Sequence, residues 1–101
     1  MIVRLTFISF QPGKAEEAKT IYNNKIIPVV KKQKGNIECR LMEPTAGTDD
    51  YISMTSWDSK KNADAYHSSG PYQELVGMLR NLYSKDPVLK VYTAQDILEH
   101  A

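Results

Sequence analysis

Three residues near the middle of the chain could act on a small molecule. His67 titrates near neutral pH when unperturbed and could take a proton from a phenolic substrate. Tyr66 could hold a substrate oxygen, and Trp57 could stack on or orient a flat aromatic ligand. Adjacent helical side chains point roughly 100° apart, so only one of Tyr66 and His67 can easily face a given pocket. The alternative is structural: both large rings fill core volume, and the histidine is partly solvated.

Smaller hydroxyl groups accompany these residues. Ser53 and Thr55 have the same strand parity as Trp57 and could fix the orientation of a ligand among apolar neighbours. Tyr72, near the start of a predicted helix, could contact a ligand in the same way. Ordinary strand and core positions are the alternative interpretation of all three.

Two further residues have simpler explanations. Arg4 shares one strand face with Thr6, and we expect it to be a dimer contact or an edge ion-pair partner rather than a ligand clamp. Cys39 has no second cysteine and no base beside it in the sequence, which favours a buried small hydrophobe.

Composition limits the class of protein. The 101 residues fit one domain over residues 1–101, and 13 basic against 12 acidic side chains give a net charge of +1. This balance lacks the basic face expected of a nucleic-acid-binding protein. One cysteine and two histidines exclude an internal disulfide and the common zinc sites. We expect a cytoplasmic protein with no metal, no cofactor and no membrane segment.

Apolar periodicity predicts the elements that position these residues. Strands are predicted at residues 2–10, 36–43, 51–57 and 88–94, and helices at residues 14–33, 60–68 and from Gly70 to about residue 83. Pro28 predicts a kink or break in the first helix, and either Asp58 or Ser59 can cap the second. The order β-α-β-β-α-β is typical of a ferredoxin-like α+β fold, with an antiparallel sheet and helices on one face.

The other sheet face then lacks a cover. We expect it to carry Ile8, Phe10, Tyr51 and Trp57 among others, and an apolar patch of this kind usually marks an interface. At about 25 cal/mol per Å², covering several hundred Å² stabilises a complex by many kcal/mol. The sequence therefore predicts a homodimer that packs sheet against sheet.

At this point the chain resembles the antibiotic biosynthesis monooxygenase group of dimeric α/β barrels. The resemblance rests on Gln11-Pro12-Gly13-Lys14, on Ile26–Val30 followed by Gly35, on Trp57-Asp58-Ser59, and on a serine-rich segment before the last long helix. It implies a homodimeric barrel with a small-molecule pocket between sheet and helices in each subunit. Several relatives oxidise anthrones or quinols with molecular oxygen and without metal or flavin.

The family's polar site residues do not carry over. Haem-degrading relatives have Asn, Trp and His where this chain has Thr6, Tyr66 and Val76, which argues against haem degradation. Anthrone-oxidising relatives have Asn and Arg where Ser53 and Val76 stand, and quinol-type relatives have His at Pro71. Because these are the family's site positions, we still expect Thr6 and Val76 to contact the substrate.

Two functions remain open. The first is a cofactor-independent monooxygenase that acts on a small aromatic quinol or anthrone with molecular oxygen, with His67, Tyr66 and Trp57 orienting or deprotonating the substrate. The second is a non-oxidative small-molecule-binding or isomerase dimer of the same superfamily, which the missing polar set favours. A closed interior without a pocket of roughly 300 Å³ would favour a purely structural role.

Overall fold

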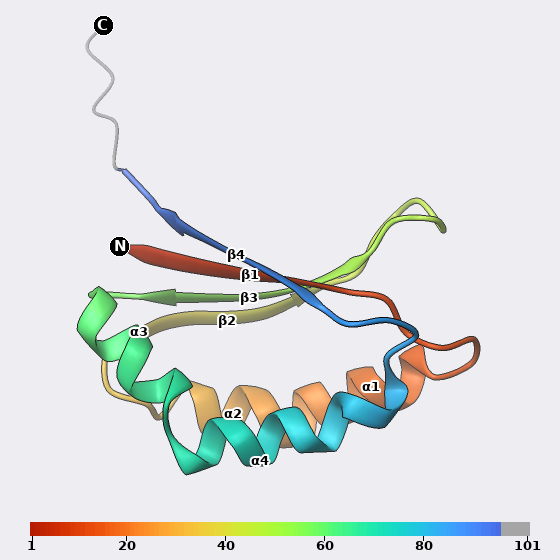
Figure 1. The fold of residues 1–101 in the computed structure, drawn as a ribbon, viewed down its shortest axis with the longest axis horizontal. Coiled ribbons are helices and arrows are strands. Elements are labelled where there is room, and N and C mark those ends of the chain that lie inside the picture. The colour runs from red at the N-terminus through yellow and green to blue at the C-terminus, as the bar shows by residue number, and fades with distance from the viewer. Residues whose placement is uncertain (96–101) are drawn as a thin grey trace, which may run out of the picture.

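The computed structural model describes residues 1–95. One antiparallel sheet has the strand order β2-β3-β1-β4, and the helices lie together on one of its faces (Figure 1). The strands are β1 (Ile2–Ile8), β2 (Asn36–Met42), β3 (Tyr51–Trp57) and β4 (Val88–Thr93). The predicted ferredoxin-like α+β fold is confirmed.

The helical layer consists of two segments that follow β1 and β3. Its elements are α1 (Ala15–Ile21), the π-helical turn η1 (Tyr22–Ile26), α2 (Ile27–Val30), α3 (Lys60–His67), α4 (Gly70–Leu79) and the 3-10 turn η2 (Arg80–Leu82). Serine side chains cap the N-termini of α3 and α4. Ser59 accepts a hydrogen bond from the backbone N–H of Asn62 in α3, and Ser69 accepts one from the backbone N–H of Tyr72 in α4.

The first helical segment widens instead of breaking at Pro28. The backbone N–H of Ile27 donates to the carbonyl of Tyr22, five residues back, which is the spacing of a π-helix. Proline has no N–H to offer, so a regular α-helix would lose its bond to the carbonyl of Asn24. The wide turn accommodates this loss before Pro28 and buries both Tyr22 and Ile26.

Gly35 connects this segment to β2 and contacts the start of α3. Its φ of +83° lies in the left-handed region that favours glycine, and a side chain there would collide with those of Asp58 and Asn62. Its carbonyl accepts a 2.9 Å bond from the backbone N–H of Asp58. The turn thereby fixes the junction between β3 and α3.

The assignment of the two sheet faces corrects one expectation. Ile8 and Trp57 are buried on the helix side, and Tyr51 has the same strand parity as Trp57, so none of the three belongs to the uncovered face. Phe10 lies beyond β1, where its ring contacts those of Tyr51 and Tyr83. Both parities of these strands carry apolar residues, so only packing against the helices decides which one faces inward.

The uncovered face is mostly apolar, but it also carries the ion pair of Arg40 with Glu38 and the ammonium of Lys90 over the ring of Phe7. It is formed by the opposite parities of the strands and includes Val3, Leu5, Phe7, Met42, Ile52, Met54, Val88 and Tyr92. We refer to these eight residues as the open face.

Ile37 departs from the predicted alternation of β2. Strict alternation would place it on the face of Cys39 and Leu41, yet its side chain is 52% exposed, while Cys39 is buried as predicted. A register shift between Asn36 and Glu38 inserts an extra residue at this point and turns Ile37 away from the core.

Within residues 1–95, no helix is both long and apolar enough to cross a membrane. The same part of the chain contains no group of three histidine, cysteine or acidic side chains placed to hold a metal ion.

Candidate active site

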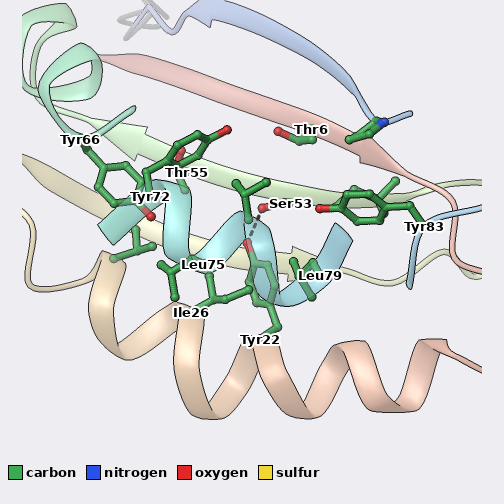
Figure 2. A pocket seen from close by; sticks show the side chains of 14 residues that line it. Thr6, Tyr22, Ile26, Ser53, Thr55, Tyr66, Tyr72, Leu75, Leu79 and Tyr83 are labelled. Carbon is green, nitrogen blue, oxygen red and sulfur yellow. Dashed lines mark hydrogen bonds between the residues drawn. The ribbon is translucent and has the colours of Figure 1, made fainter. Parts of the chain in front are cut away.

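A cavity of about 110 Å³ lies between the sheet and the helices. Its hydroxyl-bearing side chains are Thr6, Tyr22, Ser53, Thr55, Tyr66, Tyr72 and Tyr83, and its apolar ones are Ile8, Ile26, Val30, Leu75, Val76, Leu79 and Pro87. Figure 2 shows Tyr66 and Tyr72 at one end, Tyr83 at the other, and Tyr22 extending from the helical layer toward Ser53. The arrangement suits a flat apolar ligand that carries a few oxygen atoms.

The structure brings most of the candidate residues to this cavity. Those that line it are Thr6, Ser53, Thr55, Tyr66, Tyr72 and Val76. Trp57 and His67 are not among the lining residues and lie behind the Tyr66–Tyr72 end. Of the adjacent pair in α3, Tyr66 is therefore the side chain that faces the cavity.

Trp57 supports the cavity from behind. Its side chain is 0% exposed, and its ring stacks on that of Tyr66. The indole Nε1–H donates a 2.9 Å hydrogen bond to Oγ1 of Thr55, which itself lines the cavity. Trp57 thus orients two lining residues without reaching the ligand space.

Tyr22 lines the cavity and is not among the candidate residues predicted from the sequence. Its hydroxyl hydrogen-bonds that of Ser53, and Sγ of Cys39 lies 3.9 Å away. Burial is the main cause that raises the pKa of Tyr22, so the phenol stays protonated. A tyrosine on the core stripe of a helix is a usable signal, because a buried hydroxyl needs a polar partner nearby.

His67 has a defined hydrogen-bonding state. Its Nδ1 lies 2.6 Å from the carbonyl oxygen of Ala63, which can only accept, so Nδ1 carries the hydrogen. In the neutral ring the lone pair is then on Nε2. Burial lowers the pKa of His67, and the ring lies edge-on to Tyr72 with their centroids 4.7 Å apart. His67 can accept a proton at Nε2, and the ring of Tyr72 lies between it and the cavity.

Arg4 does not make the ion pair that the sequence analysis expected, at least among residues 1–95. Its Nε is buried and has no hydrogen-bond partner in this part of the chain. Burial lowers the pKa of Arg4, while Tyr72 and Asp64 act in the opposite direction. A guanidinium stays protonated in proteins regardless, so a positive charge lies in these surroundings.

The lining itself is uncharged at neutral pH. Burial raises the pKa of Tyr66 and of Tyr83, as it does for Tyr22, and apart from the phenol of Tyr72 the remaining lining side chains are serine, threonine and aliphatic groups. The cavity offers hydrogen bonds and aromatic edges, and its proton acceptor and its cation stand just outside it.

Comparisons with known proteins agree with this architecture. The sequence profile of the family described as antibiotic biosynthesis monooxygenase matches residues 1–77. No curated protein matches the chain.

Solved structures share the fold at low sequence identity. A Deinococcus radiodurans protein named for the same monooxygenase family has a TM-score of 0.84 at 13% identity, over 100% of this chain and 99% of that one. A Nitrosomonas europaea protein of that name has a TM-score of 0.81 at 14% identity, over 93% and 98%.

A variant of MhuD with two manganese protoporphyrin IX molecules bound per active site also has this fold. Its TM-score is 0.80 at 18% identity, over 99% of this chain and 100% of that one. At these identities the likeness establishes the fold alone. The profile covers three quarters of the sequence, so the chain belongs to the antibiotic biosynthesis monooxygenase family.

Proposed function

We propose that the protein is a cofactor-independent monooxygenase whose substrate is a small electron-rich aromatic of the quinol type. The observation that carries this proposal is the cavity, in which four tyrosine rings and three smaller hydroxyls from β1 and β3 surround an apolar space, with Tyr22 bonded to Ser53. Such a lining orients an aromatic ring through its faces and its oxygen atoms at once.

The size of the cavity favours one ring over three. A cavity of about 150 Å³ in another protein holds one benzene molecule, and this one measures about 110 Å³. A single-ring quinol therefore fits with small side-chain adjustments, whereas a three-ring anthrone requires the helices to move. The volume is below the roughly 300 Å³ under which we expected a purely structural role, so the proposed activity is restricted to a compact substrate.

The proposed chemistry needs a substrate anion, because an ionised quinol can itself pass electrons to oxygen. In the overall reaction a quinol and O₂ give a hydroxyquinone and one water, so one oxygen atom enters the ring and the other leaves as water. The chain's part is to bind, to orient and to accept a proton. We assign the last role to His67 and the orientation to Tyr66, Ser53 and Thr55, with Trp57 holding Tyr66 in place.

The proposed assembly is a homodimer joined through the open face. Eight apolar or aromatic side chains lie on that face, and no helix of residues 1–95 covers it (Figure 1). Covering such a patch is favourable at about 25 cal/mol per Å². The cavity lies on the other side of the sheet, so each subunit would hold a complete cavity.

Oxygen consumption tests the activity. An oxygen electrode should show uptake with a panel of single-ring quinols, after subtraction of their autoxidation, and Tyr66→Phe and Ser53→Ala should lower kcat/KM by about tenfold each through the loss of one hydrogen bond. Met78→Glu, on the outer side of α4, is the matched control and should keep the wild-type rate. Absence of uptake across the panel would sink the oxidative proposal.

A non-oxidative binding or isomerase role is the second candidate. The position of His67 outside the lining favours it, because direct proton abstraction needs contact with the substrate. Under this alternative, quinols bind and quench Trp57 fluorescence, but no oxygen is consumed and the ligand is recovered unchanged or isomerised.

A further inference from the structure

Arg4 occupies the same strand face as the hydroxyls of the cavity. It stands two residues before Thr6 in β1 and is paired across the sheet with Thr55 of β3. Thr6 and Thr55 both line the cavity, and Figure 2 places Thr55 at its Tyr66–Tyr72 end. Side chains two apart on a strand point to the same side, so Arg4 enters the helix-side layer at this end.

The surroundings of Arg4 do not balance its charge. Within residues 1–95 its Nε is buried without a hydrogen-bond partner, and no carboxylate lies within ion-pair distance. Asp64 of α3 is near enough to influence it, but that carboxylate is bonded 2.6 Å from Nζ of Lys60. Arg4 does not line the cavity and the residue as a whole is half-buried. Its buried Nε–H without a partner is nevertheless costly, and an anion on a ligand that extends past the lining toward Arg4 would remove that cost.

We propose that the ligand of this cavity carries an ionised oxygen, as a phenolate or a carboxylate, and that Arg4 pairs with it at the Thr55–Tyr72 end. The planar guanidinium suits such an oxygen because it offers several N–H donors in one plane. This inference rests on the cavity being the ligand site, as the proposed function does. It adds that the charge on the ligand, and not only its ring, is recognised.

The inference also deepens the proposed reaction. A cation at the cavity end favours the ionised form of a phenol, which is the form that reduces oxygen. Arg4 would then make a substrate hydroxyl more acidic, which lowers the basicity required of the group that takes its proton. Arg4 is in this sense a binding residue that determines specificity for acidic ligands.

Two probes test the pairing without any turnover. Benzoate and benzamide have nearly the same shape and differ in charge, and their dissociation constants can be measured by calorimetry. The second probe is 4-nitrophenol, whose phenolate has a distinct visible absorbance, so a pH titration reports the pKa of the bound phenol. The proteins are the wild type, Arg4→Met, Arg4→Lys and, as a matched control, Arg80→Met, which removes an exposed arginine of η2.

The wild type should bind benzoate about ten- to a hundredfold more tightly than benzamide, the range expected for a hydrogen bond to a charged group. Bound 4-nitrophenol should ionise at a lower pH than free 4-nitrophenol. Arg4→Met should abolish both effects while keeping benzamide affinity, Arg4→Lys should retain part of them, and Arg80→Met should match the wild type.

Three results would overturn the proposal. The first is that the wild type binds benzoate and benzamide with equal affinity, or binds neither. The second is that Arg4→Met loses affinity for both ligands equally. The third is that bound 4-nitrophenol ionises at a higher pH than free 4-nitrophenol. If Arg4→Met fails to fold, Arg4→Lys and the wild-type titration still decide. These measurements do not depend on oxygen uptake. If the protein does not oxidise quinols but prefers benzoate through Arg4, the oxidative proposal fails and this one is supported.

Discussion

The indole ring of Trp57 stacks on the phenol ring of Tyr66, with their centroids 5.3 Å apart and their planes 24° from parallel. Only Tyr66 reaches the cavity, and the indole Nε1–H is bonded to Thr55 on the other side. The tryptophan therefore holds two residues of the cavity in place, and its loss should affect the fold and the cavity together.

Trp57→Phe should lower the free energy of unfolding by about 1–3 kcal/mol, because a fully buried ring is replaced by a smaller one and a buried hydrogen bond is lost. Urea denaturation followed by circular dichroism measures this change. Thr55→Val keeps the volume but leaves the indole N–H without its acceptor, and should cost about 1–3 kcal/mol. A Trp57→Phe protein as stable as the wild type would contradict the packing described here.

His67 should make stability depend on pH. Burial lowers its pKa in the folded protein below the unfolded value of 6.5, so the unfolded chain binds the proton more readily. The contribution to the free energy of unfolding is fully present above pH 6.5 and is lost as the pH falls through the folded pKa.

Urea midpoints measured between pH 7 and pH 5 test this dependence. His67→Gln keeps a donor for the carbonyl of Ala63 but does not titrate, so its midpoint should fall less over the same range. Parallel curves for the two proteins would show that His67 is not the responsible group.

The open face should hold two chains together. Leu5 and Met54 are cross-strand partners on this face, and a glutamate at either position would place a charge in the proposed interface, at a cost of several kcal/mol. Light scattering after gel filtration at micromolar concentration should give a dimeric mass for the wild type and a monomeric mass for Leu5→Glu. Met78→Glu, on the helical side, should remain dimeric, whereas a monomeric wild type would refute the interface.

Gly35→Ala should destabilise the protein more than Gly13→Ala. Gly35 has a φ of +83° and Gly13 a φ of +79°, so alanine at either position carries the same backbone penalty of about 1 kcal/mol. At Gly35 the new Cβ would lie 2.5 Å from Oδ1 of Asp58 and Nδ2 of Asn62, while at Gly13 nothing lies within 4 Å. Overpacking should add about 1–3 kcal/mol at Gly35 alone, and equal losses in urea denaturation would count against the contact.

Strands and caps were predictable because they depend on local sequence. Alternation located β3 at residues 51–57 without error, and Ser59 caps α3 as one of the two proposed residues. The β-bulge at Ile37 was not predicted, since it depends on pairing with β3, far along the chain. Pro28 predicts a disturbance of the first helix but not its form, which is a π-turn at Tyr22–Ile26.

The cavity was predictable in its residue types but not in its boundary. Hydroxyls and rings at Ser53, Thr55, Tyr66 and Tyr72 were candidates from the sequence, and all four line it. The distinction between Tyr66 and His67 depends on how α3 is rotated against β3, and helical periodicity alone does not fix that rotation.

β1 gives alternate side chains to two surfaces for which we propose different tasks: Thr6 borders the cavity, while Leu5 and Phe7 face outward. Substitutions at even-numbered positions of β1 can therefore change ligand preference, and substitutions at odd-numbered positions can change self-association, each without the other. Gain or loss of a single residue within this strand would exchange the two sets and damage both properties at once. We expect diversification of this domain to proceed by replacement within β1 and by length changes only in its loops.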